Sequence, residues 1–160
     1  MQGKIPNPIR SANKKKLFGN AHIQALLNAI EATDTDMRFE RLIILCDADA
    51  DGLHARTLLM LFFCLHYVEL VKQQRIFTVF PPLFRVTATD GTTQYARNRV
   101  QLQSLELNCQ RSGSAVEICY YKGIASIPGD ILSATCIKPE SRSISVVTQC
   151  DGAALLSSFT

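Results

Sequence analysis

The 160-residue sequence lacks a long hydrophobic run, a signal peptide pattern and a paired cysteine motif. Its longest unbroken apolar run covers residues 58–65, far short of the ~18 residues that a membrane span needs. The first sixteen residues are basic and contain no apolar segment, so we expect no signal peptide. The six cysteines are scattered without a CxxC spacing, which favours reduced, buried thiols over a disulfide framework or a zinc site. These absences predict a cytoplasmic protein with no membrane partner.

Acidic residues are missing from the first sixteen positions. Because the whole chain has 17 basic and 14 acidic residues, the other 144 residues hold 12 basic and 14 acidic ones, a balance of −2. A basic segment on a near-neutral body is typical of binding to a polyanion such as DNA, and a solvated terminus is the alternative. Pro6 and Pro8 disfavour a helix, so residues 1–19 are predicted to be an extended basic arm. Its basic residues are Lys4, Arg10, Lys14, Lys15 and Lys16.

The first half of the remaining chain alternates helix and strand patterns. Residues 20–32 place apolar side chains at helical spacing behind an asparagine in the N-cap position. Residues 41–46 form a short, β-branched apolar run, as in a parallel strand that is covered on both faces. Residues 51–71 are too long for a strand and apolar almost all round, which indicates a buried helix.

The second half continues this alternation. Residues 75–86 supply a second strand and an extended piece, which a turn at Asp90-Gly91 joins to residues 92–96. Residues 98–113 are ambiguous between helix and loop, residues 115–123 alternate like a strand, and a short helix opens near Pro128. The pattern predicts an α/β fold over residues 20–160, with a mostly parallel sheet flanked by helices.

Three aspartates at every second position, "DADADG", follow the strand at residues 41–46. Side chains two apart on an extended segment point the same way, so Asp47 and Asp49 can converge on one point. Asp51 comes at the helix start, where it can cap N–H groups or add an oxygen through a water. Hard oxygens beyond the carboxyl end of a strand suit Mg²⁺, which is held by one or two carboxylates and keeps several waters.

Two other interpretations of the aspartates carry less weight. DxDxDG also begins an EF-hand calcium loop, which needs a helix before it and a glutamate at its twelfth position. Here a β-branched run comes first, and the twelfth position is Leu58. The other interpretation, a solvated turn with a helix cap, explains one or two aspartates but not three with this spacing.

Two basic side chains follow the aspartates in the first turn of the predicted helix. Arg56 can reach a phosphate bound at the metal, which would make it catalytic together with Asp47 and Asp49, or it can neutralise the aspartates, and the sequence does not decide between the two. His54 can donate to a phosphate or bond to a carboxylate at the helix start. His22 and His66 stand among apolar neighbours on helices and are interpreted as structural.

The segment "DADADGLHARTLLMLFFCLHYVELVKQQRIFTVFPPLFRV" resembles the TOPRIM domain of the B-type subunits of bacterial type IIA topoisomerases, DNA gyrase and topoisomerase IV. The family pattern is an apolar strand, DADxDGxHIRTLLLxFFxR, a spacer that contains PEL, a strand and PPLYKV. "GKIPN" is similar to the family's GKILN, and "YKGIASIPGDILSATCIKPESR" to its YKGLGEMNPxQLxxTTMDPxxR. The resemblance thus covers nearly the whole chain.

The resemblance implies a part of the DNA cleavage-religation centre. In the family the aspartates hold Mg²⁺ beside the scissile phosphate of double-stranded DNA, while a tyrosine from the A-type partner attacks it. Asp47 and Asp49 match the ligand positions, and Asp51 matches the third acid. Lys122 matches the lysine of YKG, near the DNA. ATP is a cofactor of the assembled enzyme and binds its N-terminal ATPase part, not these residues.

The chain also departs from the family pattern. The family's other metal-site acid, the glutamate of an EGDSA motif before GKILN, has no counterpart here, and the sequence contains no P-loop. The family's GLGEM is "GIASI", with Ala125 for the second glycine and Ser126 for the glutamate. Three hypotheses fit: a C-terminal piece of a split topoisomerase, inactive alone; a truncated or degenerate relative; or a DNA- or protein-binding module that keeps Mg²⁺ only structurally. We favour the first.

Overall fold

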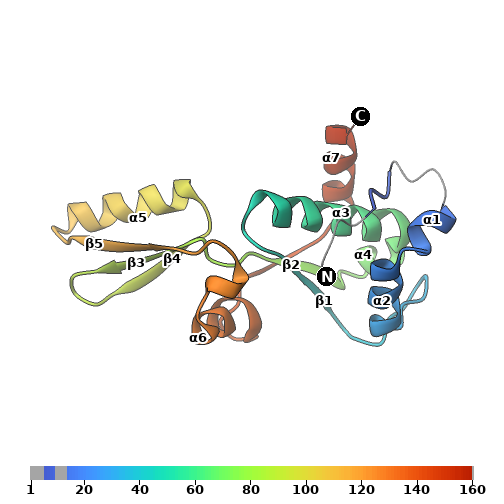
Figure 1. Cartoon of the computed structure of the whole chain (residues 1–160), viewed down its shortest axis with the longest axis horizontal. Helices are drawn as coiled ribbons and strands as arrows, with labels where there is room; N and C mark the ends of the chain where they lie inside the picture. Colours follow the sequence, from blue (N-terminus) through green and yellow to red (C-terminus); the bar gives the residue numbers. More distant parts are fainter. Residues whose placement is uncertain (1–5, 10–13, 160) are drawn as a thin grey trace. The chain divides into compact units, whose positions relative to one another are not determined.

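The computed structural model describes residues 6–9 and 14–159, and it divides the chain into two compact units (Figure 1). The first unit takes the described residues within Met1–Ile44, Leu53–Thr78 and Ile144–Thr160, and the second takes Leu45–Gly52 and Val79–Ser143. The two units are defined by contacts within the chain. They do not test whether residues 20–160 form the predicted domain, which stays a prediction. No helix among the described residues is long and apolar enough to cross a membrane.

The first unit begins with α1 (Lys14–Phe18) and α2 (Ala21–Ile30). The expectation of an extended arm over residues 1–19 is therefore wrong from Lys14 onward. The physical reason is burial: Leu17 is 1% exposed, and the ring of Phe18 lies against Phe62 with 5.8 Å between centroids. The prolines at positions 6 and 8 are too far upstream to oppose this helix.

The predicted start of α2 is confirmed in detail. The side chain of Asn20 accepts hydrogen bonds from the backbone N–H of His22 at 3.0 Å and of Ile23 at 3.3 Å. These bonds satisfy two of the N–H groups that a helix start leaves without a partner. Ile23 and Ile30, two of the predicted apolar positions, are buried.

The sheet of the first unit has three strands in the order β1-β2-β6: β1 (Leu42–Leu45), β2 (Ile76–Val79) and β6 (Ile144–Val146). β1 and β2 confirm two predicted strands, whereas β6 was not expected. The loop before β1 is held by Arg75, whose Nη2 donates to the carbonyls of Met37 at 2.9 Å and Phe39 at 2.7 Å. The same guanidinium bonds to the carboxylate of Asp36 and thereby lowers its pKa.

The long helix predicted over residues 51–71 is two helices, α3 (Ala50–His66) and α4 (Val68–Lys72). Tyr67 between them has non-helical angles, with φ −130° and ψ 50°. Its ring contacts Phe63 at 5.8 Å and Phe62 at 5.6 Å between centroids. Residues five apart do not share a face of a continuous helix, so the break allows the contact with Phe62. The unit ends with α7 (Gln149–Phe159).

The second unit contains a sheet in the order β4-β3-β5, formed by β3 (Phe84–Ala88), β4 (Thr93–Ala96) and β5 (Val116–Tyr120). Both pairings are antiparallel, so for these strands the expectation of a mostly parallel sheet is wrong. The predicted hairpin explains part of this, because a tight turn can join only antiparallel neighbours. Gly91 at that turn has φ +85°, a conformation that favours glycine.

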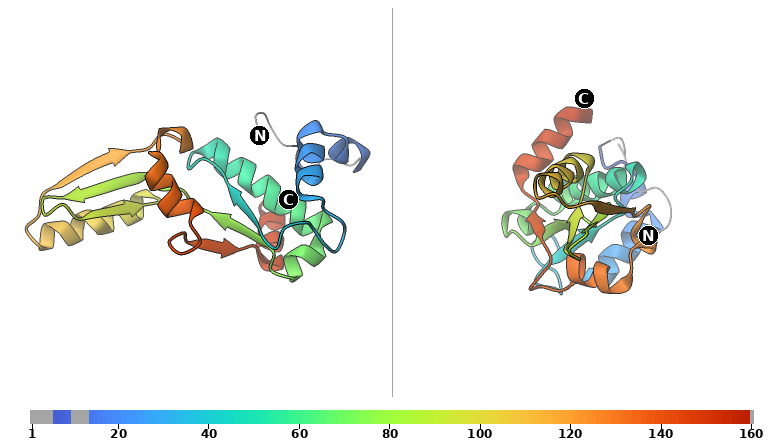
Figure 2. Two further views of the ribbon diagram at one scale, coloured as in Figure 1. Left: turned by 90° about the horizontal axis from the view of Figure 1, so that it is seen from below. Right: turned by 90° about the vertical axis from the view of Figure 1, so that its left-hand side faces the viewer.

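The ambiguous residues 98–113 contain α5 (Arg99–Arg111), which covers one face of this sheet along β3 and β4 (Figure 2). After β5 the chain forms a 3₁₀ turn, η1 (Ile124–Ser126), then α6 (Gly129–Leu132) and a π-helical turn, η2 (Ser133–Ile137). Tyr121, Ile127 and Ile131 form a small core between these pieces.

Candidate functional site

The aspartate segment forms the connection between β1 and α3. The Oδ1 atom of Asp49 accepts the backbone N–H of Gly52 at 2.7 Å, so this carboxylate caps the start of α3. Gly52 lies so close to the preceding turn that an added Cβ would stand 2.2 Å from the backbone oxygen of Asp47. Only glycine fits there, which explains why the aspartate block ends in this residue.

Asp47 is tied to a segment far along the chain. Its Oδ1 atom accepts the backbone N–H of Ile124 at 2.7 Å, across 77 residues of sequence. An added Cβ on Gly123 would lie 3.1 Å from the same oxygen, so the turn approaches the carboxylate closely. The aspartate is thereby fixed in position by the η1 turn, and both belong to the second unit.

The η1 turn is closed by Ser126. Its hydroxyl donates to the carbonyl of Gly123 at 2.6 Å and accepts the N–H of Gly123 at 3.2 Å. Ser126 stands where the resembled family has glutamate, so this chain holds the turn with a serine hydroxyl. The resemblance pointed to this loop, but its contact with Asp47 had no signal in the local sequence.

The three aspartates do not form a ready-made metal cage. Among the described residues, no group of three or more His, Cys, Asp or Glu side chains is placed to hold a metal ion. Asp47 and Asp49 each use Oδ1 for a backbone bond, and each has a second carboxylate oxygen. Asp51 is exposed in the first turn of α3. This donor set fits Mg²⁺ that keeps most of its waters, and it does not fit a fully protein-bound ion.

The predicted basic residues are spread over both units. Lys122 is exposed beside Gly123 in the second unit. His54, exposed, and Arg56, only 5% exposed, belong to the first unit. Lys15 and Lys16 are exposed on α1. The side chain of Lys14 is not described, and Lys4 and Arg10 lie outside the described residues. The prediction that these residues contact DNA stays a prediction.

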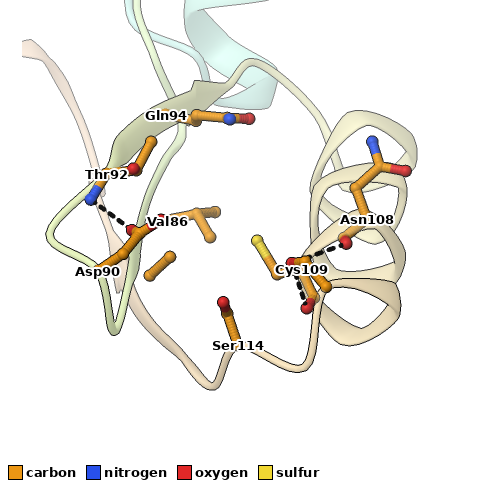
Figure 3. Close-up of a pocket in the computed structure, with 9 residues that line it drawn as sticks. Val86, Asp90, Thr92, Gln94, Asn108, Cys109 and Ser114 are labelled. Carbon is orange, nitrogen blue, oxygen red and sulfur yellow. Dashed lines mark hydrogen bonds between the residues drawn. The ribbon is translucent and has the colours of Figure 1, made fainter.

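A cavity of about 170 Å³ lies between the β3–β4 hairpin and the end of α5 (Figure 3). Two of its polar side chains bond to neighbouring backbone groups. Asp90 accepts the N–H of Thr92 at 2.8 Å, a bond that lowers the pKa of this carboxyl, and the hydroxyl of Ser112 donates to the carbonyl of Cys109 at 2.8 Å. The Asp90 carboxylate and the Ser112 hydroxyl are thus held by the turn and the helix end that line the cavity.

Comparisons with known proteins agree with the sequence resemblance. No protein-family model matches the chain. It is 32% identical over 158 residues to the B-type subunit of DNA topoisomerase 4 from Mycoplasma capricolum, covering 95% of this chain and 24% of that protein. It is 34% identical over 154 residues to the corresponding topoisomerase 4 protein of Caulobacter vibrioides, covering 92% and 22%. It is 32% identical over 159 residues to the B-type subunit of DNA gyrase from Mycoplasmoides gallisepticum, covering 96% and 24%.

A solved structure supports the fold. The topoisomerase II DNA-binding, cleavage and re-ligation domain of Plasmodium falciparum matches with a TM-score of 0.63 at 24% identity, over 79% of this chain and 18% of that chain. The chain spans about a quarter of the length of the curated relatives. The sequence resemblance is confirmed: the chain is a homologue of a segment of the B-type subunits of bacterial type IIA topoisomerases, DNA gyrase and topoisomerase IV.

Proposed function

We propose that this chain supplies the Mg²⁺-binding part of the DNA cleavage-religation centre of an ATP-dependent type II topoisomerase. The observation that carries the proposal is the fixed position of Asp47. This carboxylate is held by Ile124 N–H at 2.7 Å, at the end of the strand where the TOPRIM domain of the family has its first aspartate. The proposal extends to a TOPRIM arrangement of the β1-β2-β6 sheet.

The roles of the residues follow from their chemistry. Asp47 and Asp49 would hold the ion through their second carboxylate oxygens, and Asp51 would bind one of its waters. A bound Mg²⁺ supplies charge stabilisation at the scissile phosphate. Lys122, exposed next to the η1 turn, would contact the DNA backbone. His54 and Arg56, which directly follow the aspartates in the sequence, are proposed for phosphate contacts, and neutralisation of the aspartates is the alternative for Arg56, which is 5% exposed.

The nucleophilic tyrosine and the ATPase activity belong to other parts of the assembly in this proposal. The A-type subunit provides the tyrosine, and ATP is bound by the N-terminal part of a B-type subunit. We expect the isolated chain to be inactive.

One observation favours an alternative. The described residues do not bring three candidate metal ligands together. This arrangement also fits a truncated or degenerate TOPRIM relative that only binds DNA or protein and is not catalytic. The two hypotheses differ in what happens when the missing parts are added.

Reconstitution tests the proposal. The chain is combined with the N-terminal part of a homologous B-type subunit and with an A-type subunit, and Mg²⁺-dependent relaxation of supercoiled DNA is measured. We expect the reconstituted enzyme to be active and Asp47→Asn to abolish this activity. Asp90→Asn is the control: it removes the same charge from an exposed turn, and we expect the activity to be retained. A thermal melt with and without Mg²⁺ provides a readout that does not require activity. Failure of every pairing, with no shift of the melt, would support the non-catalytic alternative.

A further inference from the structure

Two neighbouring depressions on the second unit share Tyr95 and Arg97, at the end of β4. The smaller, of about 110 Å³, is also lined by Phe80, Thr135, Ser141 and Ser143. The larger and shallower, of about 400 Å³, is also lined by Val100, Gln101, Ser104 and Leu105. All these residues belong to the same compact unit. We call the two depressions together the β4 groove; β4 and α5 mark its place in Figure 1.

Arg97 is the charged residue of the β4 groove. No acidic residue lines either depression, and within the described part of the chain its guanidinium takes part in no ion pair. Its backbone N–H donates to the side chain of Gln101 at 2.8 Å, which fixes the main chain at this point. A guanidinium offers five N–H donors in a planar fork that matches carboxylate and phosphate oxygens. An anionic group is therefore the chemistry that Arg97 would recognise.

The hydroxyl groups of the smaller depression divide into donors and acceptors. Thr135 donates to the carbonyl of Ile131 at 2.7 Å, and Ser141 donates to the carbonyl of Ala134 at 2.6 Å. Their hydrogens are thus taken, so both hydroxyls can only accept, and Thr135 Oγ1 also lies 3.5 Å from the Sγ of Cys136. Ser143 makes no such bond with the described residues, so it can donate. A matching ligand carries acceptor oxygens for Arg97 and Ser143, and a hydroxyl or water that donates to the other two.

Exposed apolar and aromatic surface lies on both sides of Arg97. Val100 is 72% exposed, Tyr95 39% and Phe80 37%. An inorganic anion gains nothing from such surface, whereas a nucleobase stacks on aromatic rings and covers aliphatic side chains. Charge, hydroxyls and flat apolar surface together fit a nucleotide and not an isolated anion.

The start of α5 supports the same conclusion. This helix of 13 residues has Arg99 and no acidic residue in its first turn, and Arg97 stands just before its N-cap, Asn98. Cations are unfavourable at the positive end of a helix dipole, where acidic residues are usually preferred. A phosphate bound at Arg97 would offset this repulsion.

We propose that the β4 groove binds a nucleotide unit, with its phosphate on Arg97 and Ser143, its sugar beside Thr135 and Ser141, and its base against Tyr95 and Val100. The unit belongs either to a nucleic acid strand, which would add a DNA contact to the proposed function, or to a free nucleotide. The two sources share the same chemistry. The inference uses none of the aspartates and so does not rest on the proposed metal site.

Binding to the full chain is measured by fluorescence anisotropy with a labelled 12-nucleotide single-stranded DNA, and by calorimetry with deoxyadenosine monophosphate and inorganic phosphate. A chelator is present, so that no divalent ion bound at the aspartates contributes to the measured binding. We expect Arg97→Gln to weaken nucleotide binding about tenfold or more, as loss of a charge-assisted contact predicts. Arg99→Gln is the matched control. It removes the same charge from the same helix start, but Arg99 does not line the groove, so we expect less than about a threefold loss.

Two further variants separate the parts of the contact. Ser143→Ala should weaken both nucleotide and phosphate binding, while Val100→Ser should weaken binding of the nucleotide and leave that of inorganic phosphate unchanged. Both side chains are exposed, so we expect folding to be retained, which circular dichroism checks. A loss of oligonucleotide binding in Arg97→Gln as large as the loss of mononucleotide binding identifies a strand as the source, and a loss confined to the mononucleotide identifies a free nucleotide. Equal losses in Arg97→Gln and Arg99→Gln, or no effect of Val100→Ser, would overturn the proposal.

Discussion

The carboxylate of Asp47 and the backbone N–H of Ile124 form a 2.7 Å hydrogen bond that joins residues 77 positions apart. It connects the segment after β1 to the turn that carries Lys122 and Gly123. A carboxylate that is already held by the backbone loses less conformational freedom when it binds a further ligand. The bond therefore prepares Asp47 for the role that the family resemblance implies.

Replacement of Asp47 tests this bond directly. Asp47→Ala leaves the Ile124 N–H without its acceptor, so we expect a loss of about 1–3 kcal/mol in unfolding free energy. Asp47→Asn keeps an amide oxygen in the same place, and we expect less than half of that loss. Urea denaturation gives the stability, and hydrogen exchange of the Ile124 amide reports the bond itself. Equal exchange rates in Asp47→Ala and the unchanged chain would show that the bond does not form in solution.

Asp49 allows its capping role to be separated from its charge. Asp49→Ala removes the acceptor for the Gly52 N–H and should cost about 1 kcal/mol, as for other lost N-caps. Asp49→Asn should cost little, because asparagine caps as well as aspartate does. Both variants should lose any rise in melting temperature that Mg²⁺ gives. If Asp49→Asn keeps the full Mg²⁺ response, Asp49 caps the helix and is no metal ligand.

Gly52 is required by space and not by backbone angles. In Gly52→Ala the new Cβ would stand 2.2 Å from the Asp47 oxygen, so the turn between β1 and α3 must move. We expect a loss of at least ~2 kcal/mol, typical of overpacking against backbone. Gly129→Ala is the matched control, since no atom lies within 4 Å of its added Cβ and it starts α6. There we expect no loss, or a gain of up to ~1 kcal/mol. Similar losses in both variants would contradict the steric argument.

The sequence predicts well where one local pattern determines the structure. The N-cap at Asn20 and the hairpin turn at Asp90-Gly91 are both present, because each depends on residues within a few positions. The break at Tyr67 and helix α1 were missed, since both follow from aromatic packing onto α3 that local periodicity does not encode. The bond between Asp47 and Ile124 is a contact of the same long-range kind. This bond fixes the position of the Asp47 carboxylate, whereas the sequence only matches Asp47 to a family motif.

The hydroxyl of Tyr121 provides a test of the small core in the second unit. Tyr121 is 3% exposed, and its hydroxyl makes no hydrogen bond with the residues that the structure describes. Burying a hydroxyl without a hydrogen bond is unfavourable, and Tyr121→Phe removes that hydroxyl. Near pH 7 we therefore expect the unfolding free energy to stay the same or to rise by up to ~1 kcal/mol. Tyr120→Phe, at the preceding residue where β5 ends but 57% exposed, should be neutral.

The pH dependence gives this prediction a second readout. Burial raises the pKa of Tyr121 above its ordinary value of 10.0. Because the folded state then resists deprotonation more than the unfolded state does, the contribution of this group to stability is fully present below about pH 10 and is lost as the pH rises through the folded pKa. Unfolding free energies measured in urea from pH 8 to about pH 11 should therefore fall less steeply for Tyr121→Phe than for Tyr120→Phe. Parallel curves for the two variants would show that the Tyr121 hydroxyl reaches water or a partner in the folded chain.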